Sequence, residues 1–180
     1  MNAPMSRARR IELLMWNFIS FFGTIAAGVL FIALAFVLDF RFGCIALVNL
    51  ALITIGSNTY KYHYWKARPD NPQHIRPEQP FPVLALHKYL NPKNAIAQFR
   101  FIDSGSMPSI HSARSFNFAV LFAGYLGDFY WYPLFLIIAA FIGASRIVKL
   151  RHDIRDVSVG MLVGIIIGVL SLPWIERLAG

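Results

Sequence analysis

Three short stretches of this sequence contain residue types that bind and transfer phosphate. In the last of them, Asp156 follows His152 by four residues, a spacing that places both side chains on one face of a helix. The carboxylate can accept a hydrogen bond from one imidazole nitrogen and leave the other nitrogen as a base or nucleophile. A His and an Asp near a helix start also serve as ordinary capping residues, so this pair alone leaves both interpretations open.

The two earlier stretches supply positive charge and hydrogen-bond donors. Lys61 and Arg68 enclose six residues, and Pro69 ends the helix that carries Lys61. Further along, Ser109 stands at the expected N-cap of a helix and His111 in its first turn, where free backbone N–H groups form an anion site. Cations at a membrane edge and a plain helix cap are the simpler interpretations of these two stretches.

All three stretches lie at the ends of long apolar runs, and counting the membrane crossings places these ends on one side of the membrane. We therefore expect them to form one pocket. Positively charged groups and hydrogen-bond donors around two histidines suit a phosphate, whose transfer depends on positioning and on stabilising its oxygens. The side chains in question are Lys61, Arg68, Ser109, His111, Arg146 and His152.

A metal site is a competing interpretation of the third stretch. His152 together with Asp153 and Asp156 resembles a small ligand cluster. Carboxylate-rich Mg²⁺ sites usually recruit more ligands than this, so we predict that no metal is required.

The apolar runs must be the elements that position these groups. Of the 180 residues, 57% are hydrophobic and only 14% are charged. Residues 13–38 contain no charge and exceed the ~20 positions that a spanning helix needs, which disfavours a soluble helical core. We predict an all-α, polytopic membrane bundle of about five transmembrane helices, with residues 1–180 forming a single domain and the site at one membrane face. The further spans are expected at 43–60, 112–127, 129–146 and 156–173.

Two segments flank or separate these spans. Residues 1–12 form a basic flank, and the apolar run behind it is too long for a signal peptide, so we expect it to remain as an anchor. The polar loop 61–110 is rich in proline and cannot be one helix. Its Val83, Leu86 and Leu90 have the spacing of a short interfacial helix, although a surface loop packed on the bundle explains them equally well.

The three stretches also resemble, in order and spacing, the motifs of the type 2 phosphatidic acid phosphatase superfamily. Those motifs are a Lys, six residues and Arg-Pro; then Pro-Ser-Gly-His; then Ser-Arg, five residues, a His, three residues and an Asp. Here they are Lys61 with Arg68-Pro69, Pro108-Ser109-Ile110-His111, and Ser145-Arg146 with His152 and Asp156.

The resemblance implies a role for each matching residue. His152 would attack phosphorus to give a phosphohistidine, Asp156 would orient it, and His111 would protonate the leaving oxygen and later activate water. No metal or other cofactor would take part. The residues implied in phosphate binding are Lys61, Arg68, Ser109, Ile110 and Arg146.

One position departs from the family pattern. The glycine of the second motif is Ile110 here, and a β-branched residue cannot adopt the backbone angles that are open only to glycine. The N–H of Ile110 can still face the phosphate if the residue is helical. A catalytically silent lipid-phosphate binder is therefore an alternative function, and a vanadium-dependent haloperoxidase is disfavoured by the apolar character of the chain.

The distribution of charge bears on partners and orientation. The net charge of +8 is carried mostly at span ends, which suits anionic lipid headgroups or an anionic substrate, and no nucleic-acid-binding module is visible. With five spans, every Lys and Arg except Arg41 and Arg177 lies on the side of the site, which places the site in the cytoplasm. Phosphatidic acid, phosphatidylglycerol phosphate and polyprenyl diphosphate all fit as substrates.

Overall fold

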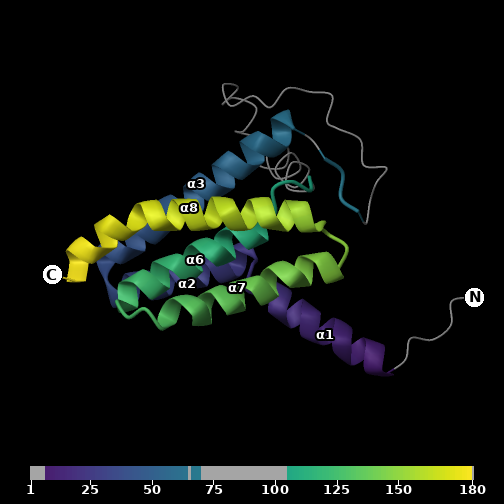
Figure 1. Ribbon diagram of the computed structural model, residues 1–180, viewed down its shortest axis with the longest axis horizontal. Coiled ribbons are helices and arrows are strands. Elements are labelled where there is room, and N and C mark those ends of the chain that lie inside the picture. Colours follow the sequence, from purple (N-terminus) through teal and green to yellow (C-terminus); the bar gives the residue numbers. More distant parts are fainter. Residues whose placement is uncertain (1–6, 65, 70–104, 180) are drawn as a thin grey trace, which may run out of the picture.

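The chain folds into helices whose polar ends meet at one end of a bundle. The computed structural model describes residues 7–64, 66–69 and 105–179, and the regular elements of these residues are α-helices (Figure 1). This architecture confirms the predicted all-α fold. The helices are α1 (Arg7–Phe21), α2 (Ile25–Leu38), α3 (Phe40–His63), α6 (Ile110–Leu126), α7 (Trp131–Val148) and α8 (Ile154–Ala179).

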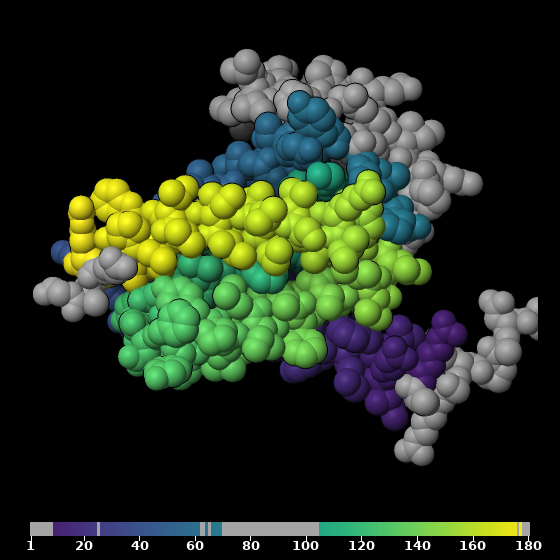
Figure 2. All heavy atoms as spheres, in the orientation of Figure 1, coloured from purple at the N-terminus to yellow at the C-terminus, as the bar shows by residue number. Residues whose placement is uncertain are grey.

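The first apolar run is broken where the sequence predicted one continuous span over 13–38. The chain leaves α1 after Phe21, and Thr24 caps α2 by accepting a hydrogen bond from the N–H of Ala27 at 3.3 Å. The two helices differ in direction by 46°. Absence of charge measures only whether a run tolerates lipid, so it did not reveal a capping threonine inside the run. Figures 1 and 2 show α1 leaving the bundle at its edge, where it contacts α7.

Three described helices have the length and composition of membrane spans. They contain the stretches Phe40–Lys61, Trp131–Val148 and Ile154–Ile175, and the bent pair of α1 and α2 adds a fourth if it forms one span. The 17-residue α6 packs against α3, α7 and α8, and most of its residues are buried. The count of five transmembrane helices stays a prediction, and the expected interfacial helix at 83–90 lies outside the described residues.

A stripe of glycines brings the backbones of α6 and α8 into direct contact. A Cβ atom at Gly160 would stand 2.4 Å from the carbonyl oxygen of Ser109, and one at Gly164 would stand 2.2 Å from that of Ala113. A Cβ atom at Gly168 would stand 2.8 Å from the Cβ of Val120. Small residues at four-residue spacing allow such close approach between membrane helices. The spacing is visible in the sequence, but it does not by itself identify the helix that these glycines contact.

Replacing Gly164 with alanine should therefore destabilise the protein. The new methyl group would overlap the Ala113 carbonyl, so the helices must separate, which costs about 1–3 kcal/mol. Thermal unfolding in detergent measures the loss. The matched control is Gly56→Ala in α3, because a Cβ there meets nothing within 4 Å. Equal unfolding temperatures for the two variants would show that the α6–α8 contact is looser than described.

The largest buried apolar cluster lies at the end of the bundle opposite the buried charged groups. Phe42 of α3 stacks on Tyr125 of α6 with ring centroids 4.4 Å apart, and Ile175 of α8 joins the same buried cluster. The other end collects the last turn of α3, the first turns of α6 and α8, and the end of α7 (Figure 1). The sequence-predicted site residues all lie in or beside these ends.

Candidate functional site

Charged and polar side chains are buried together where these four helix ends meet. Lys61, at the end of α3, is only 1% exposed, and His152, between α7 and α8, is 3% exposed. Ser109, Arg146 and Asp156 are also buried. Burying so many polar groups is costly unless they are paired, so their arrangement indicates a functional site.

The imidazole of His152 is held by a backbone carbonyl. Its Nδ1 lies 2.7 Å from the carbonyl oxygen of Ser106 and 3.8 Å from Oδ2 of Asp156. Because a carbonyl oxygen can only accept, Nδ1 carries the proton and Nε2 keeps its lone pair. The sequence spacing allows Asp156 to accept this hydrogen bond. In the structure the Ser106 carbonyl lies nearer to Nδ1, and Asp156 stands within ion-pair distance of it.

Ser106 connects His152 to Asp156 and was missed by the sequence analysis. Its hydroxyl donates to Oδ2 of Asp156, its carbonyl accepts from His152, and its N–H donates to the carbonyl of Lys66 at 2.8 Å. The side chain is fully buried. No motif singles this serine out, because its role depends on a backbone carbonyl whose direction the sequence does not give.

Lys66 is a second residue that the sequence did not assign to the site. Its ammonium donates to Asp153 at 2.5 Å and to Asp156 at 2.6 Å. Burial lowers the pKa of Lys66, but the hydrogen bonds to the two carboxylates raise it and prevail. The ammonium thus occupies the place between the carboxylates that a metal ion would need. Within the described ranges, no group of three or more His, Cys, Asp or Glu side chains has the arrangement of a metal site.

The turn between α7 and α8 places Arg146 beside His152. The carbonyl of Arg146 accepts hydrogen bonds from the N–H groups of Arg151 at 3.0 Å and His152 at 3.3 Å, and Leu150 adopts a left-handed conformation between them. Burial lowers the pKa of His152, and the positive charges of Arg146, Lys61 and Arg68 lower it further, although Asp156 opposes them. His152 is therefore held in its neutral form, in which Nε2 can attack an electrophile.

The start of α6 carries the second predicted motif. Ser109 caps the helix by accepting from Ser112 N–H at 3.5 Å, and its own N–H donates to the backbone carbonyl of Asp156 at 3.0 Å. That N–H is thus used within the protein. His111 is half-buried and lies within electrostatic reach of Arg146 and His152. The first and third motifs therefore converge on the second, as predicted.

Ile110 is accommodated without strain. It is the first residue of α6, and its backbone is helical, so it needs none of the angles reserved for glycine. Its side chain is buried against Ile53 of α3 and Val163 of α8. A glycine here would remove this packing, so the departure from the family pattern has a structural role.

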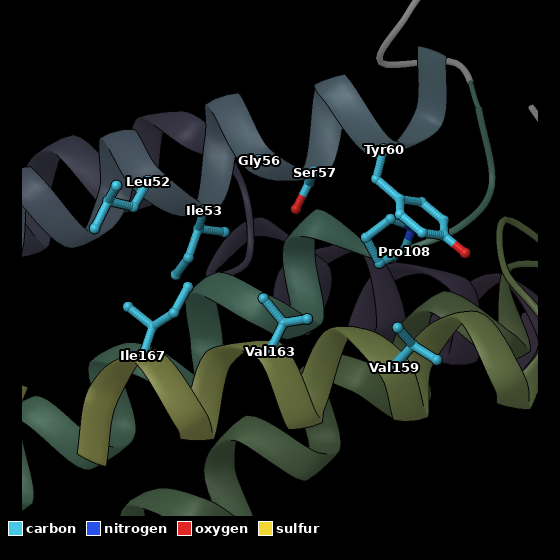
Figure 3. Close-up of a pocket in the computed structure, with 9 residues that line it drawn as sticks. All are labelled: Leu52, Ile53, Gly56, Ser57, Tyr60, Pro108, Val159, Val163 and Ile167. Carbon is cyan, nitrogen blue, oxygen red and sulfur yellow. The ribbon is translucent and has the colours of Figure 1, made fainter. Parts of the chain in front are cut away.

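A pocket of about 250 Å³ opens beside the polar cluster, between α3 and α8. Figure 3 shows it running from Leu52 and Ile167 at one end to Tyr60 and Pro108 at the other. Val159 and Val163 of α8 line its floor, and Ser57 is one of its few polar groups. Tyr60 and Pro108 directly precede Lys61 and Ser109, so the apolar pocket adjoins the polar site.

Comparison with known proteins identifies the family. No curated protein and no solved structure matches the chain significantly. The sequence profile described as the PAP2 superfamily matches residues 42–179, from the start of α3 to the end of α8, and leaves out α1 and α2. The match includes all the helix ends that build the buried polar cluster, and it confirms the resemblance carried by the three motifs. This chain belongs to the PAP2 superfamily.

Proposed function

We propose that this protein is an integral-membrane phosphatase that hydrolyses a lipid phosphate or diphosphate through a phosphohistidine, without a metal ion. Membership of the superfamily indicates a phosphatase. The observation that carries the mechanism is the hydrogen bond from His152 Nδ1 to the Ser106 carbonyl, which leaves Nε2 neutral amid positive charge. That is the arrangement a nucleophile toward phosphorus needs.

In the first step, Nε2 of His152 attacks phosphorus and the bond from phosphorus to the lipid oxygen breaks. Burial and the surrounding positive charges lower the pKa of His111, and the negative charge of a bound phosphate opposes that effect and favours the protonated form. Protonated His111 then gives its proton to the leaving oxygen, so the alcohol or lipid monophosphate departs as a protonated product. Lys61, Arg68 and Arg146 balance the charge that spreads over the phosphoryl oxygens. Asp156, 3.8 Å from Nδ1, stabilises the imidazolium as it forms.

In the second step, a water molecule attacks phosphorus and the bond to Nε2 breaks. His111, now neutral, accepts the water proton, and inorganic phosphate leaves with His152 restored. His111 thus acts as an acid in the first step and as a base in the second, so one site serves both steps.

The pocket between α3 and α8 supports a lipid substrate. Its lining is mainly apolar, and it adjoins the polar site at Tyr60 and Pro108. A hydrocarbon chain lying along this pocket would present a phosphate at Lys61 and Ser109. The excess of Lys and Arg at this end supports a cytoplasmic orientation of the site.

The direct test is phosphate release by the purified protein in detergent with EDTA present. The panel consists of phosphatidic acid, phosphatidylglycerol phosphate and polyprenyl diphosphate. Release from at least one lipid in EDTA is expected. Loss of activity that Mg²⁺ restores would replace the proposed mechanism with a metal-assisted one. Binding of a lipid phosphate without any release would identify a silent binder.

In the pH profile of kcat/KM, the acid limb should lie below pH 6.5, which is the ordinary pKa of a histidine side chain. Because burial and the neighbouring positive charges lower the pKa of His152, the neutral nucleophile persists as pH falls through 6.5 and is lost only at its lower pKa. Burial, and then the positive charges around it, also lower the pKa of His111, the proposed acid. Rates from about pH 4.5 to about pH 9 should therefore trace a bell whose two limbs belong to the coupled histidines and both lie below pH 6.5 in the free enzyme. An acid limb above 6.5 would contradict a depressed nucleophile.

Filling the pocket should penalise long-chain substrates selectively. Gly56 lines the pocket, and a side chain built there meets no neighbour within 4 Å, so Gly56→Phe places a ring in the pocket without a backbone clash. We expect kcat/KM for a long-chain lipid phosphate to fall about tenfold relative to a short-chain analogue. The control is Ile55→Phe, at an exposed neighbouring position on α3. Equal losses for the long-chain and short-chain substrates would mean that the hydrocarbon chain of the lipid binds outside this pocket.

A further inference from the structure

The break between α1 and α2 reaches into the phosphate site. Ser20, in the last turn of α1, accepts a hydrogen bond from Nη1 of Arg146 at 2.8 Å. Both residues are buried, at 3% and 7% exposure. A buried guanidinium has few rotamers left, so a fixed acceptor on one side decides where its other N–H groups point.

The same break also packs against His111. A Cβ atom at Gly23 would stand 2.9 Å from both Cβ and Cδ2 of His111 and 2.9 Å from Cγ2 of Ile142. Non-bonded carbon atoms do not approach a Cβ this closely, so a side chain at position 23 would displace the imidazole, Ile142 or the helices that carry them. The absence of a side chain at Gly23 thus defines the space that His111 occupies.

The path of the chain through the break is fixed locally. The N–H of Thr24 donates to the carbonyl of Phe21 at 2.9 Å, and the Thr24 hydroxyl caps α2 through Ala27. Neither of these two bonds involves Ser20 or Gly23. The structure therefore offers a means to alter the local backbone without touching either site contact, through Thr24.

We propose that the α1–α2 break is a positioning element of the phosphatase site, in which Ser20 orients Arg146 toward phosphate and Gly23 sets the place of His111. The proposal rests on the proposed function for its catalytic part. It extends the site beyond the family match, which begins at residue 42. Neither residue touches the reacting atoms, so both act through the side chains that do.

The test of Ser20 uses orthovanadate, a phosphate mimic, together with turnover of the preferred lipid. Ser20→Ala should weaken orthovanadate binding, measured by calorimetry, about tenfold and raise KM by a similar factor, because Arg146 loses its fixed acceptor. Ser20→Thr keeps the hydroxyl and should restore both values. Thr24→Ala is the control: it removes the cap of α2 and lowers stability while leaving orthovanadate binding unchanged.

The test of Gly23 uses the leaving group. Gly23→Ala should displace His111 and reduce kcat about tenfold more for an alkyl phosphate than for p-nitrophenyl phosphate, whose leaving group departs without a proton. Equal reduction for both substrates would mean a general disturbance of the fold, and the role assigned to Gly23 would be overturned.

The outcomes separate the two proposals. If the wild-type protein binds orthovanadate but releases phosphate from nothing, the proposed function fails while the comparison of Ser20→Ala with Thr24→Ala still decides the positioning role. If Ser20→Ala binds orthovanadate as tightly as wild type, or no more weakly than Thr24→Ala, the positioning role is overturned whatever the turnover. Absence of orthovanadate binding by the wild type overturns both.

Discussion

Replacing His152 with alanine is expected to reduce phosphate release by about 10⁴-fold or more, since loss of a nucleophile removes the covalent route altogether. The substitution leaves Lys61, Arg68 and Arg146 in place, so binding of a lipid phosphate or of orthovanadate should persist. Phosphate release and calorimetric binding on the same preparation measure the two effects. The expected pattern is therefore a protein that binds but does not turn over.

The matched control for this experiment is Arg151→Ala. Arg151 is the neighbour of His152 in the same turn and is exposed. Its variant tests whether the turn tolerates truncation, and it should retain most of the activity. Undiminished hydrolysis by His152→Ala would remove the phosphohistidine from the mechanism. Loss of binding together with activity would instead assign His152 to substrate binding.

Replacing Asp156 with asparagine should lower kcat by about 10²-fold, the size of effect expected from a group that acts through the nucleophile. The loss should be smaller than the ~10⁴-fold seen where an acid alone sets the histidine tautomer, because the Ser106 carbonyl already does so here. The loss in kcat that we still expect has two causes. The negative charge 3.8 Å from Nδ1 is missing, and the NH2 group of the asparagine must point at one of two donors, the Lys66 ammonium or the Ser106 hydroxyl.

Asp153→Asn provides the comparison for Asp156→Asn. Asp153 shares Lys66 as its partner, but its side chain is 40% exposed, whereas Asp156 is fully buried and also accepts from the Ser106 hydroxyl. We expect the Asp153 variant to lose less than about tenfold in kcat. Equal losses in the two variants would show that the carboxylates act mainly by holding Lys66. If Asp156→Asn lost as much activity as His152→Ala, then Asp156 would set the tautomer of His152 directly.

The motif residues were the part of the site that the sequence revealed best. Lys61, Ser109, and the pair Arg146 and His152 come from three separate stretches, yet their position at the ends of apolar runs placed them correctly at one end of a bundle. That inference needs only the length of each run and the direction of the chain. The roles of these residues in catalysis stay predictions until the variants are measured.

The contacts that depend on backbone direction were not accessible to the same reasoning. The carbonyl of Ser106 and the break after Phe21 act through main-chain geometry, which spacing and charge do not report. Lys66 was visible as a charge but had no motif, so its position between two carboxylates could not be foreseen. The sequence also left open whether Ile110 can replace the family glycine, because that depends on the backbone angles of the residue.

The glycines of α8 contact α6, and the residues that precede them line the pocket. Gly160, Gly164 and Gly168 fix α8 to α6 by backbone contact, and each is preceded by a residue that lines the pocket. Those pocket residues are Val159, Val163 and Ile167. One face of α8 thus packs on α6, which carries His111, while the adjacent face lines the pocket and, at Val163, packs against Ile110. Under the proposed function, a larger side chain in place of Val159 would shorten the lipid chain that fits the pocket and leave the backbone contact between α6 and α8 in place.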